Sequence, residues 1–217
     1  MKLIPEWYEH QYCLIAWPCN KDLYGKIINK ARDEVANVIN EIAKTEHVIV
    51  LSNKEDINEI QNKTDNKNID IVECKLDDSW MRDIAPIFYN EDEKLKSISF
   101  EFNGYGKYPD YLNDNKISKF ISNYLNIPTK ISDLVIEGGA ITYDDKKNLF
   151  STKNVIFNKN RKQKHNSEYI IKELKFLFDL NYIFLFENGL MEDDTDGHVD
   201  NLSVSYTHLT LPTIHRV

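Results

Sequence analysis

The sequence is poor in glycine, proline and cysteine and has no long apolar run. Only 7 glycines and 6 prolines occur among 217 residues, about half of the usual share of roughly 12%, so glycine is expected where the backbone requires it. Three widely spaced cysteines argue against a disulfide framework and favour a reducing compartment. No apolar run approaches the roughly 20 residues of a membrane span, and the first residues lack a signal-peptide core. We therefore expect a soluble, cytoplasmic protein without a membrane segment.

The chain also lacks net positive charge. It has 27 Lys and Arg against 35 Asp and Glu, which gives a formal net charge of −8. A net acidic protein is a poor partner for nucleic acid, so a small cationic molecule is the more natural ligand. No glycine-rich motif of the GxGxxG or P-loop type occurs, and nucleotide binding therefore has no support in the sequence.

The sequence does contain alternating strand and helix patterns. Apolar residues at helical spacing predict helices, the longest with Asp22 as its N-cap, and short apolar or alternating runs predict strands. The helices are expected over 22–44, 54–61, 111–125 and 166–178, and the strands over 12–17, 48–51, 69–74, 86–89, 97–102, 134–136, 140–143, 148–152 and 182–186. Alternation without segregation predicts an α/β protein. The strand-rich stretches between the helices favour repeated ββαβ modules over a doubly wound sheet.

Three short segments concentrate residues that could carry chemistry, and the first is residues 77–86 (DDSWMRDIAP). The segment connects two predicted strands, where functional groups are commonly displayed. A carboxylate such as Asp83 could accept a bidentate hydrogen-bonded pair from a guanidinium or amidinium group. Arg82 could orient that carboxylate or pair with another acid. The alternative is a solvated loop with an internal ion pair.

The second segment, residues 134–143 (LVIEGGAITY), places a lone Glu137 between two apolar strands. Gly138 and Gly139 follow it directly and predict a tight bend. Such a bend could aim the carboxylate into a cavity. Taken alone, however, the segment is better explained as an ordinary hairpin with a charged residue beside its turn.

The third segment, residues 192–200 (EDDTDGHVD), holds five carboxylates and one histidine in nine residues. It does not fit an EF-hand, because Ser203 occupies the twelfth position, where a Glu closes the calcium loop. A metal hydrolase that uses His198 and Asp200 is one alternative, although no HExxH motif accompanies it. General acid–base chemistry by His198 beside Asp200 is another, because alternate residues of a strand face the same side. A solvated acidic loop is the non-functional alternative.

Five segments, in their order along the chain, resemble the agmatine deiminase family, which also contains the Porphyromonas-type peptidylarginine deiminases. They are residues 5–18 (PEWYEHQYCLIAWP), 78–86 (DSWMRDIAP), 102–106 (FNGYG), 137–139 (EGG) and 194–201 (DTDGHVDN). The resemblance implies the pentein fold, an α/β propeller of five ββαβ modules around a pseudo-fivefold axis, with roughly three modules in this chain. It also implies hydrolysis of agmatine to N-carbamoylputrescine and ammonia in putrescine biosynthesis, without a metal or organic cofactor, and a homo-oligomer of the complete protein.

The resemblance also implies roles for individual residues. Asp83 and Asp200 would bind the guanidinium group, and Trp80 would line the site. His198 would carry protons, and Glu137 would be an active-site acid. The supporting residues would be Arg82, Asp196, Gly138 and Gly139. In the family, a cysteine thiolate attacks the guanidinium carbon and water cleaves the resulting thiouronium intermediate.

The family's nucleophilic cysteine lies far downstream of the His-Val-Asp motif, in a glycine-rich segment. Here 17 residues follow Asp200, and none is cysteine. Cys13, Cys19 and Cys74 lie at positions that the family does not use for catalysis. We therefore expect that this chain has no nucleophilic cysteine and is inactive as it stands.

The last part of the sequence differs in character from the rest. Residues 204–213 (VSYTHLTLPT) resemble a translated transposon mosaic-end sequencing adapter over ten consecutive positions. We expect residues 1–203 to be part of one deiminase domain and residues 204–217 to be a non-native tail, which is excluded from reasoning about the fold. A genuine Thr-rich strand is the alternative.

Two other classes of function stay open at this point. A metal-dependent hydrolase built on residues 192–200 would be sensitive to chelators, whereas thiol chemistry needs no metal. A noncatalytic guanidinium-binding module would account for both the acidic residues and the missing nucleophile. The motifs do not distinguish agmatine from arginine or peptidyl-arginine, although an acidic site disfavours the extra carboxylate of arginine.

Overall fold

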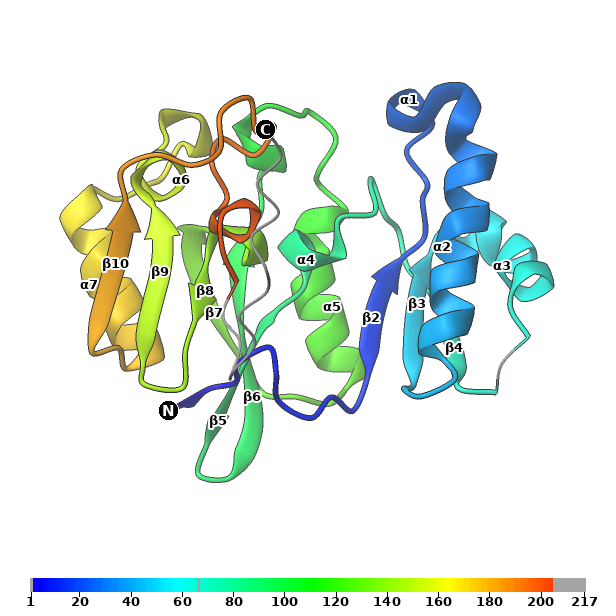
Figure 1. The fold of residues 1–217 in the computed structure, drawn as a ribbon, viewed down its shortest axis with the longest axis horizontal. Coiled ribbons are helices and arrows are strands. Elements are labelled where there is room, and N and C mark those ends of the chain that lie inside the picture. Colours follow the sequence, from blue (N-terminus) through cyan, green and yellow to red (C-terminus); the bar gives the residue numbers. More distant parts are fainter. Residues whose placement is uncertain (1, 66, 205–217) are drawn as a thin grey trace, which may run out of the picture.

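Three small sheets and the helices between them form the framework of the computed structural model, which describes residues 2–65 and 67–204 (Figure 1). The strands are β1 (Lys2–Leu3), β2 (Cys13–Ala16), β3 (Val48–Ser52), β4 (Ile69–Glu73), β5 (Ile87–Glu91), β6 (Lys94–Glu101), β7 (Thr129–Val135), β8 (Thr142–Tyr143), β9 (Asn148–Thr152) and β10 (Tyr182–Phe186). The α-helices are α1 (Lys21–Tyr24), α2 (Ile28–Ile42), α3 (Ile57–Lys63), α4 (Met81–Ile84), α5 (Ile117–Tyr124), α6 (Lys153–Ile156) and α7 (Ser167–Phe178). Short 3-10 helices are η1 (Gly25–Ile27), η2 (Lys54–Asp56), η3 (Gly104–Gly106), η4 (Asp114–Lys116), η5 (Gly138–Ala140), η6 (Lys159–Arg161) and η7 (Val199–Asn201).

The connectivity of the sheets shows the expected ββαβ module twice. The first sheet consists of β2–β4, the second of β1 and β5–β7, and the third of β8–β10. In the second sheet, β5 pairs antiparallel with β6, and β6 pairs parallel with β7 after the crossover through α5. The third sheet repeats this pattern with β8, β9, α7 and β10. The first sheet differs, because β2, β3 and β4 are all parallel and α2 and α3 supply the crossovers that parallel strands need.

Each of the first two sheets is enclosed between helices. The first sheet packs Val48 and Val50 on α2, whereas Ile49 and Leu51 lie in the cluster with Ile117 of α5. Every residue of β3 is therefore buried, as expected for a short apolar strand covered on both faces. In Figure 1, α5 stands between the first and second sheets.

The second sheet is likewise covered by a helix on each face. On the α5 side, the hydroxyl groups of Ser97 and Ser122 are hydrogen-bonded at 2.9 Å. On the other side, Ile98 and Phe100 share a cluster with Leu174 of α7. The helix of each ββαβ module thus also covers the sheet that precedes it.

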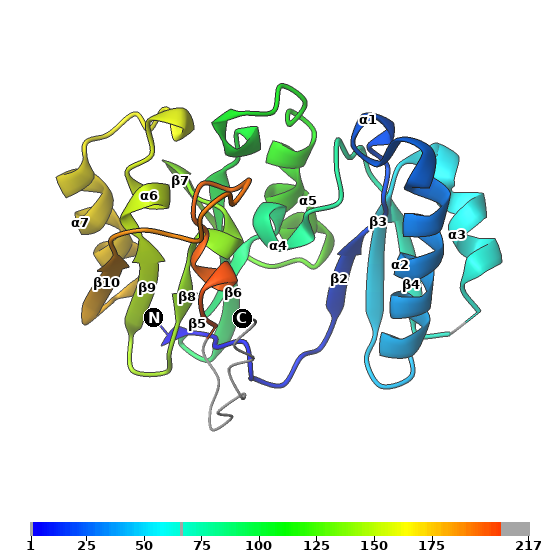
Figure 2. The same cartoon turned by 45° about the horizontal axis from the view of Figure 1, so that its top comes forward.

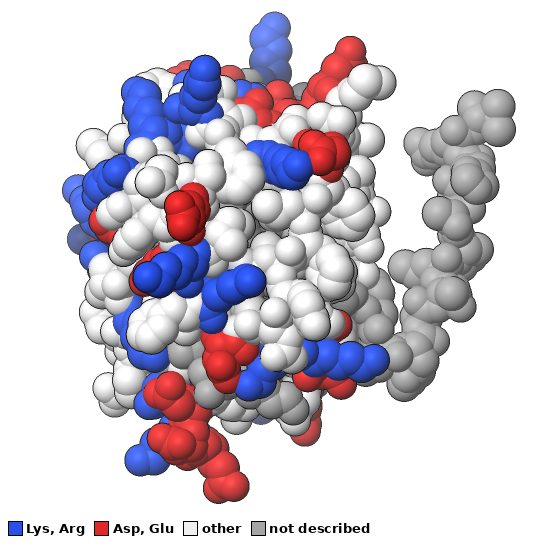
Figure 3. Space-filling model, turned by 90° about the vertical axis from the view of Figure 1, so that its left-hand side faces the viewer, with Lys and Arg blue, Asp and Glu red and all other residues white. Residues whose placement is uncertain are grey.

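The third sheet has one covered face and one open face. Ile183 and Leu185 pack on the cluster of α7, whereas Tyr182, Phe184 and Phe186 alternate to the opposite side and are 64%, 47% and 45% exposed. Uncharged side chains occupy much of the middle of the surface on this side of the molecule (Figure 3). Within the described part of the chain, this sheet face stays open to solvent.

Most expected elements are present, with differences in the predicted long helix. Asn20 is the N-cap instead of Asp22, because its side chain accepts the N–H of Leu23 at 3.0 Å. The predicted helix is also divided, since Gly25 has a φ of 50° and ends α1. The connection over 77–85 contains α4, which was not expected.

Two further predictions concern a membrane span and the C-terminal tail. Among the described residues, no helix has both the length and the apolar character to cross a membrane. The tail proposed for residues 204–217 lies outside the described residues except for Val204.

Candidate active site

The predicted site residues meet where three short helical turns touch one another. The turns are α4, η5 and η7, and η5 contacts both of the others. They bring Asp83, Gly139 and Asp200 together from three distant parts of the sequence, with His198 as the residue that precedes η7. Figure 2 shows the turn near residue 200, coloured red, in the middle of the molecule.

His198 is the centre of this cluster and is buried among three carboxylates. Its Nε2 atom lies 3.5 Å from Glu137 Oε2, and its Nδ1 atom lies 3.7 Å from Asp83 Oδ1 and 4.0 Å from Asp200 Oδ1. Burial, the largest effect, pushes the pKa of His198 down, but the three acidic neighbours outweigh it and raise that pKa above its ordinary value. The protonated imidazolium is therefore favoured in this position.

The expectation that His198 and Asp200 lie on a strand is wrong. Asp200 lies in the 3-10 turn η7 and His198 is the residue that caps this turn, so the two do not alternate along a strand. The two side chains nevertheless reach the same cluster.

Glu137 is held in its ionised form by a buried arginine. Arg161 Nε donates to Glu137 Oε1 at 3.1 Å, and the side chains of both residues are only 1% exposed. Burial raises the pKa of Glu137, but contact with His198 and the charge of Arg161 together hold it below the usual value. Glu137 is thus an anionic partner for His198 in a region closed to water.

The two aspartates proposed to bind the guanidinium group differ in exposure. Asp83 is buried and accepts the N–H of Gly139 and the hydroxyl of Tyr105, both at 2.8 Å. Asp200 is partly exposed and lies 4.0 Å from Arg82 Nε. Burial raises the pKa of both carboxyls, against the opposing charge of His198. A bound cation would stabilise their charged forms and offset the cost of their desolvation.

The glycine pair leaves the space around which these groups are arranged. A Cβ atom on Gly139 would lie 2.5 Å from His198 Nδ1, 2.6 Å from Asp200 Oδ2 and 2.8 Å from Asp83 Oδ1. A Cβ atom on Gly138 would lie 2.0 Å from the carbonyl oxygen of Arg82. Only glycine lets the backbone approach these groups so closely.

The remaining predicted residues lie around this cluster. Arg82 forms an ion pair with Glu6 at 2.5 Å, and Trp80 is half exposed, with its indole N–H donated to Asp78 at 3.1 Å. Asp196 accepts from Arg161 Nη1 at 3.1 Å and pairs with Lys107 at 2.5 Å.

Two residues of the cluster received no role in the sequence analysis. Tyr105 stands in the FNGYG segment and has a φ of 59° between two glycines, which aims its hydroxyl at Asp83. Burial and the charge of Asp83 raise the pKa of Tyr105, so its hydroxyl keeps the proton that it donates. Arg161 stands in a polar, lysine-rich run without a recognisable pattern, so no local signal marks it as buried.

Replacing Glu137 with glutamine is expected to lower the pKa of His198 by about one unit or more, because the carboxylate next to Nε2 is removed. The measurement is an NMR titration of the imidazole resonances of the 217-residue chain. The resonances of His165, which pairs with Asp133 elsewhere on the surface, serve as the internal control. An unchanged pKa of His198 in this variant would contradict the described geometry.

The metal-hydrolase alternative would need several ligand side chains grouped around one point. Among residues 2–65 and 67–204, no group of three or more His, Cys, Asp or Glu side chains is arranged to hold a metal ion. The carboxylates around His198 instead approach its two ring nitrogens.

Comparison with known proteins assigns the chain to a family. The model of the Porphyromonas-type peptidyl-arginine deiminase family matches residues 2–211. This chain belongs to that family. A relative in Mycoplasma capricolum, provisionally named an agmatine deiminase, is 33% identical over 214 residues, which cover 95% of this chain and 58% of the relative. The agmatine deiminase of Pseudomonas aeruginosa is 29% identical, over 90% of this chain and 55% of the relative.

Solved structures of the family confirm the predicted pentein fold. The agmatine deiminase of Enterococcus faecalis superimposes with a TM-score of 0.86 at 19% identity, over 92% of this chain and 56% of that protein. A C. jejuni agmatine deiminase variant with substrate bound has a TM-score of 0.83 at 28% identity, over 92% and 60%. The chain thus spans little more than half the length of these family members, which fits the incomplete set of propeller modules expected from the sequence.

Proposed function

We propose that this chain is part of an agmatine deiminase, which hydrolyses the guanidinium group of agmatine to N-carbamoylputrescine and ammonia in putrescine biosynthesis. The observation that carries the proposal is the arrangement of His198 between the buried Glu137 on one side and Asp83 and Asp200 on the other. The names of the family members support the same substrate.

Each member of the cluster has a chemical task in this reaction. Asp83 and Asp200 bind the guanidinium cation by charge and hydrogen bonds in a largely water-excluded site, where such interactions are strong. Glu137 keeps His198 protonated, so that its imidazolium can donate a proton to the departing ammonia. The neutral imidazole that results then accepts a proton from the attacking water.

The nucleophilic thiol of this reaction has no counterpart among the cysteines of the chain. Burial, followed by nearby carboxylates, raises the pKa of Cys19 to about 12. Burial likewise raises the pKa of Cys74 to about 11. Cys13 lies in β2 beneath α2, and burial raises the pKa of its thiol as well. A thiol with such a pKa is protonated near neutral pH and is a poor nucleophile, so the proposal assigns the nucleophile to sequence beyond this chain.

Agmatine suits the described surroundings better than arginine. The segment that carries His198 also carries Asp193, Asp194 and Asp196, and a cavity of about 800 Å³ lies beside it. Asp196 is already paired with Lys107 and Arg161, and Asp193 accepts four hydrogen bonds. The exposed carboxylate of Asp194 is therefore the group that attracts a primary amine and repels the additional carboxylate of arginine.

The test compares this chain with a longer polypeptide encoded at the same locus. Expressed as a soluble protein, the longer polypeptide is expected to release ammonia from agmatine, and the 217-residue chain is expected to release none. In the longer polypeptide, His198→Ala is expected to abolish release. His165→Ala, at a partly exposed histidine that pairs with Asp133 away from the cluster, is expected to retain it.

Three outcomes would contradict the proposal. Ammonia release by the 217-residue chain alone would show that no further nucleophile is needed. Release from arginine but not from agmatine would assign another substrate. Loss of activity with a chelator that is restored by a divalent metal would favour the hydrolase alternative.

A further inference from the structure

The segment that carries His198 has an irregular backbone that needs a specific support. Asp196 and Gly197 both have positive φ, so residues 193–198 form neither a helix nor a strand ladder. The backbone N–H groups of such a segment must find acceptors outside regular secondary structure.

One side chain supplies most of these acceptors. Asp193 Oδ1 accepts the N–H of Thr195 at 3.0 Å, and Oδ2 accepts the hydroxyl of Thr195 at 2.6 Å and the N–H groups of Gly197 and His198, each at 2.9 Å. Three of these four donors converge on Oδ2, as an ionised carboxylate oxygen can accept. Partial burial opposes the charge of Asp193, but the hydrogen bonds prevail and lower its pKa to about 2.

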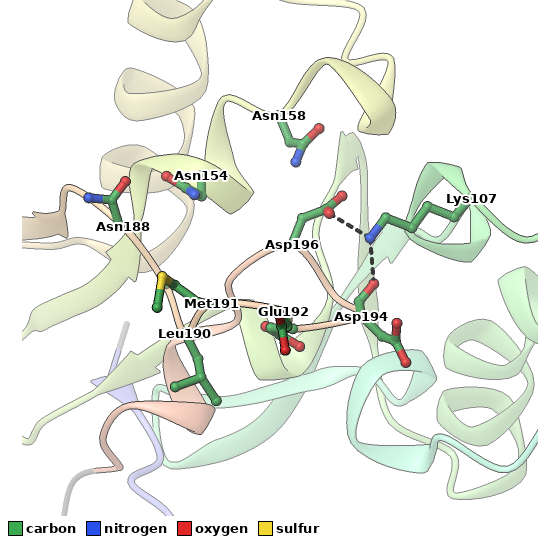
Figure 4. Close-up of a pocket in the computed structure, with 11 residues that line it drawn as sticks. Lys107, Asn154, Asn158, Asn188, Leu190, Met191, Glu192, Asp194 and Asp196 are labelled. Carbon is green, nitrogen blue, oxygen red and sulfur yellow. Dashed lines mark hydrogen bonds and ion pairs between the residues drawn. The ribbon is translucent and has the colours of Figure 1, made fainter.

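The outer side of the segment is anchored by different residues. Lys107 donates to the carbonyl oxygen of Asp194 at 2.9 Å and pairs with Asp196 (Figure 4). Arg161 donates to the carbonyl oxygen of Thr195 at 2.6 Å. Lys107 and Arg161 thus bind acceptor groups of the segment, whereas Asp193 accepts the backbone N–H of His198 itself.

We infer that Asp193 is a positioning residue, which sets the place of the His198 imidazole between Glu137 and Asp83. The backbone of His198 is fixed by the Asp193 carboxylate, and the ring then projects into the cluster from a defined point. Without the carboxylate, the buried N–H of Gly197 loses its acceptor and that of His198 keeps only the longer contact with Thr195 Oγ1 at 3.3 Å. The turn then relaxes, which moves the ring away from its acidic partners. The inference rests on the proposed role of His198 as the proton carrier.

The test is an NMR titration of the His198 ring in the 217-residue chain and its variants. Asp193→Ala is expected to lower the pKa of His198 by about one unit, because the imidazole moves away from the carboxylates that stabilise its charge. Asp193→Asn, which keeps one acceptor oxygen, is expected to lower it by less. The matched control is Asp194→Ala at the exposed neighbouring residue, which is expected to leave it within about 0.2 units because exposed charges interact weakly.

The two substitutions at Asp193 separate position from charge. Both remove the same negative charge, so equal pKa shifts in the two variants would assign the effect to charge alone and overturn the inference, as would no shift in either. Should Asp193→Ala not fold, Asp193→Asn is compared with Asp194→Asn, and equal pKa values of His198 in these two variants would also overturn it. The titration does not depend on ammonia release, so a failure of the proposed function is seen separately.

Discussion

Replacing Gly139 with alanine is expected to lower the turnover of agmatine by the complete protein by about 10²-fold, because a displacement of about 1 Å is enough for such a loss. The new methyl group would lie 2.5 to 2.8 Å from polar atoms of His198, Asp200 and Asp83. Normal contact with carbon needs about 3.5 Å, so these side chains must move. Two of them, His198 and Asp83, are buried and have little room to do so.

The control for this substitution is Gly25→Ala. Gly25, unlike Gly139, has a positive φ of 50°, and a Cβ atom there has open space around it. Its expected cost is about 1–3 kcal/mol of backbone strain, without an effect on turnover. The measurements are ammonia release under saturating agmatine and urea unfolding of each variant. Turnover that falls equally in both variants would show that a general loss of stability, and not crowding of the site, is responsible.

Replacing Arg161 with alanine is expected to destabilise the folded chain by about 3–5 kcal/mol, the cost of removing one partner from a buried ion pair. The loss leaves Glu137 in a buried position with His198 as its remaining ionic partner. Asp196 loses one of its two cations and keeps Lys107. The backbone carbonyl of Thr195 also loses its donor.

Arg82→Ala is the matched control, since it removes the same side chain from a partly exposed ion pair with Glu6. Ion pairs of that kind contribute about 0–1 kcal/mol, so this variant is expected to unfold close to the wild-type urea midpoint. The free energy of unfolding from urea titration, followed by circular dichroism, compares the two. A similar small loss in both variants would mean that Glu137 is not dependent on Arg161 for its charge.

The position of several elements could be read from apolar periodicity. The strands β9 and β10 match the predicted ranges residue for residue. β10 is an unbroken apolar run, whereas β9 has only Leu149 and Phe150 between polar residues. The helix predicted over 22–44 was wrong in its continuity, because the apolar pattern persists across Gly25 while the backbone there turns to positive φ. The apolar residues on either side of this turn, Leu23 and Ile27, are 50% and 62% exposed, so their helical spacing did not reflect burial.

Residues of the candidate site could be predicted from the sequence only where they are grouped in short segments. Asp83, Glu137, His198 and Asp200 stand in short segments with unusual composition, and the structure brings all four together. Whether they perform the proposed roles is a matter for the experiments above. Arg161 and Asp193 could not be singled out, because neither a lysine-rich run nor one acid among five shows which side chain is buried or which carboxylate collects N–H donors.

The sequence by itself determined the α/β class, the family resemblance and the segments that hold the reactive groups, because these are properties of local composition and order. The tertiary structure alone decided that Glu137 meets Arg161, 24 residues away, and that Asp83 meets Gly139, 56 residues away. It also decided that the scarce glycines at 138 and 139 face the cluster, where a side chain would collide with it. Such contacts depend on how three sheets and their helices pack, and the charge state of each buried group follows from the neighbours that this packing provides.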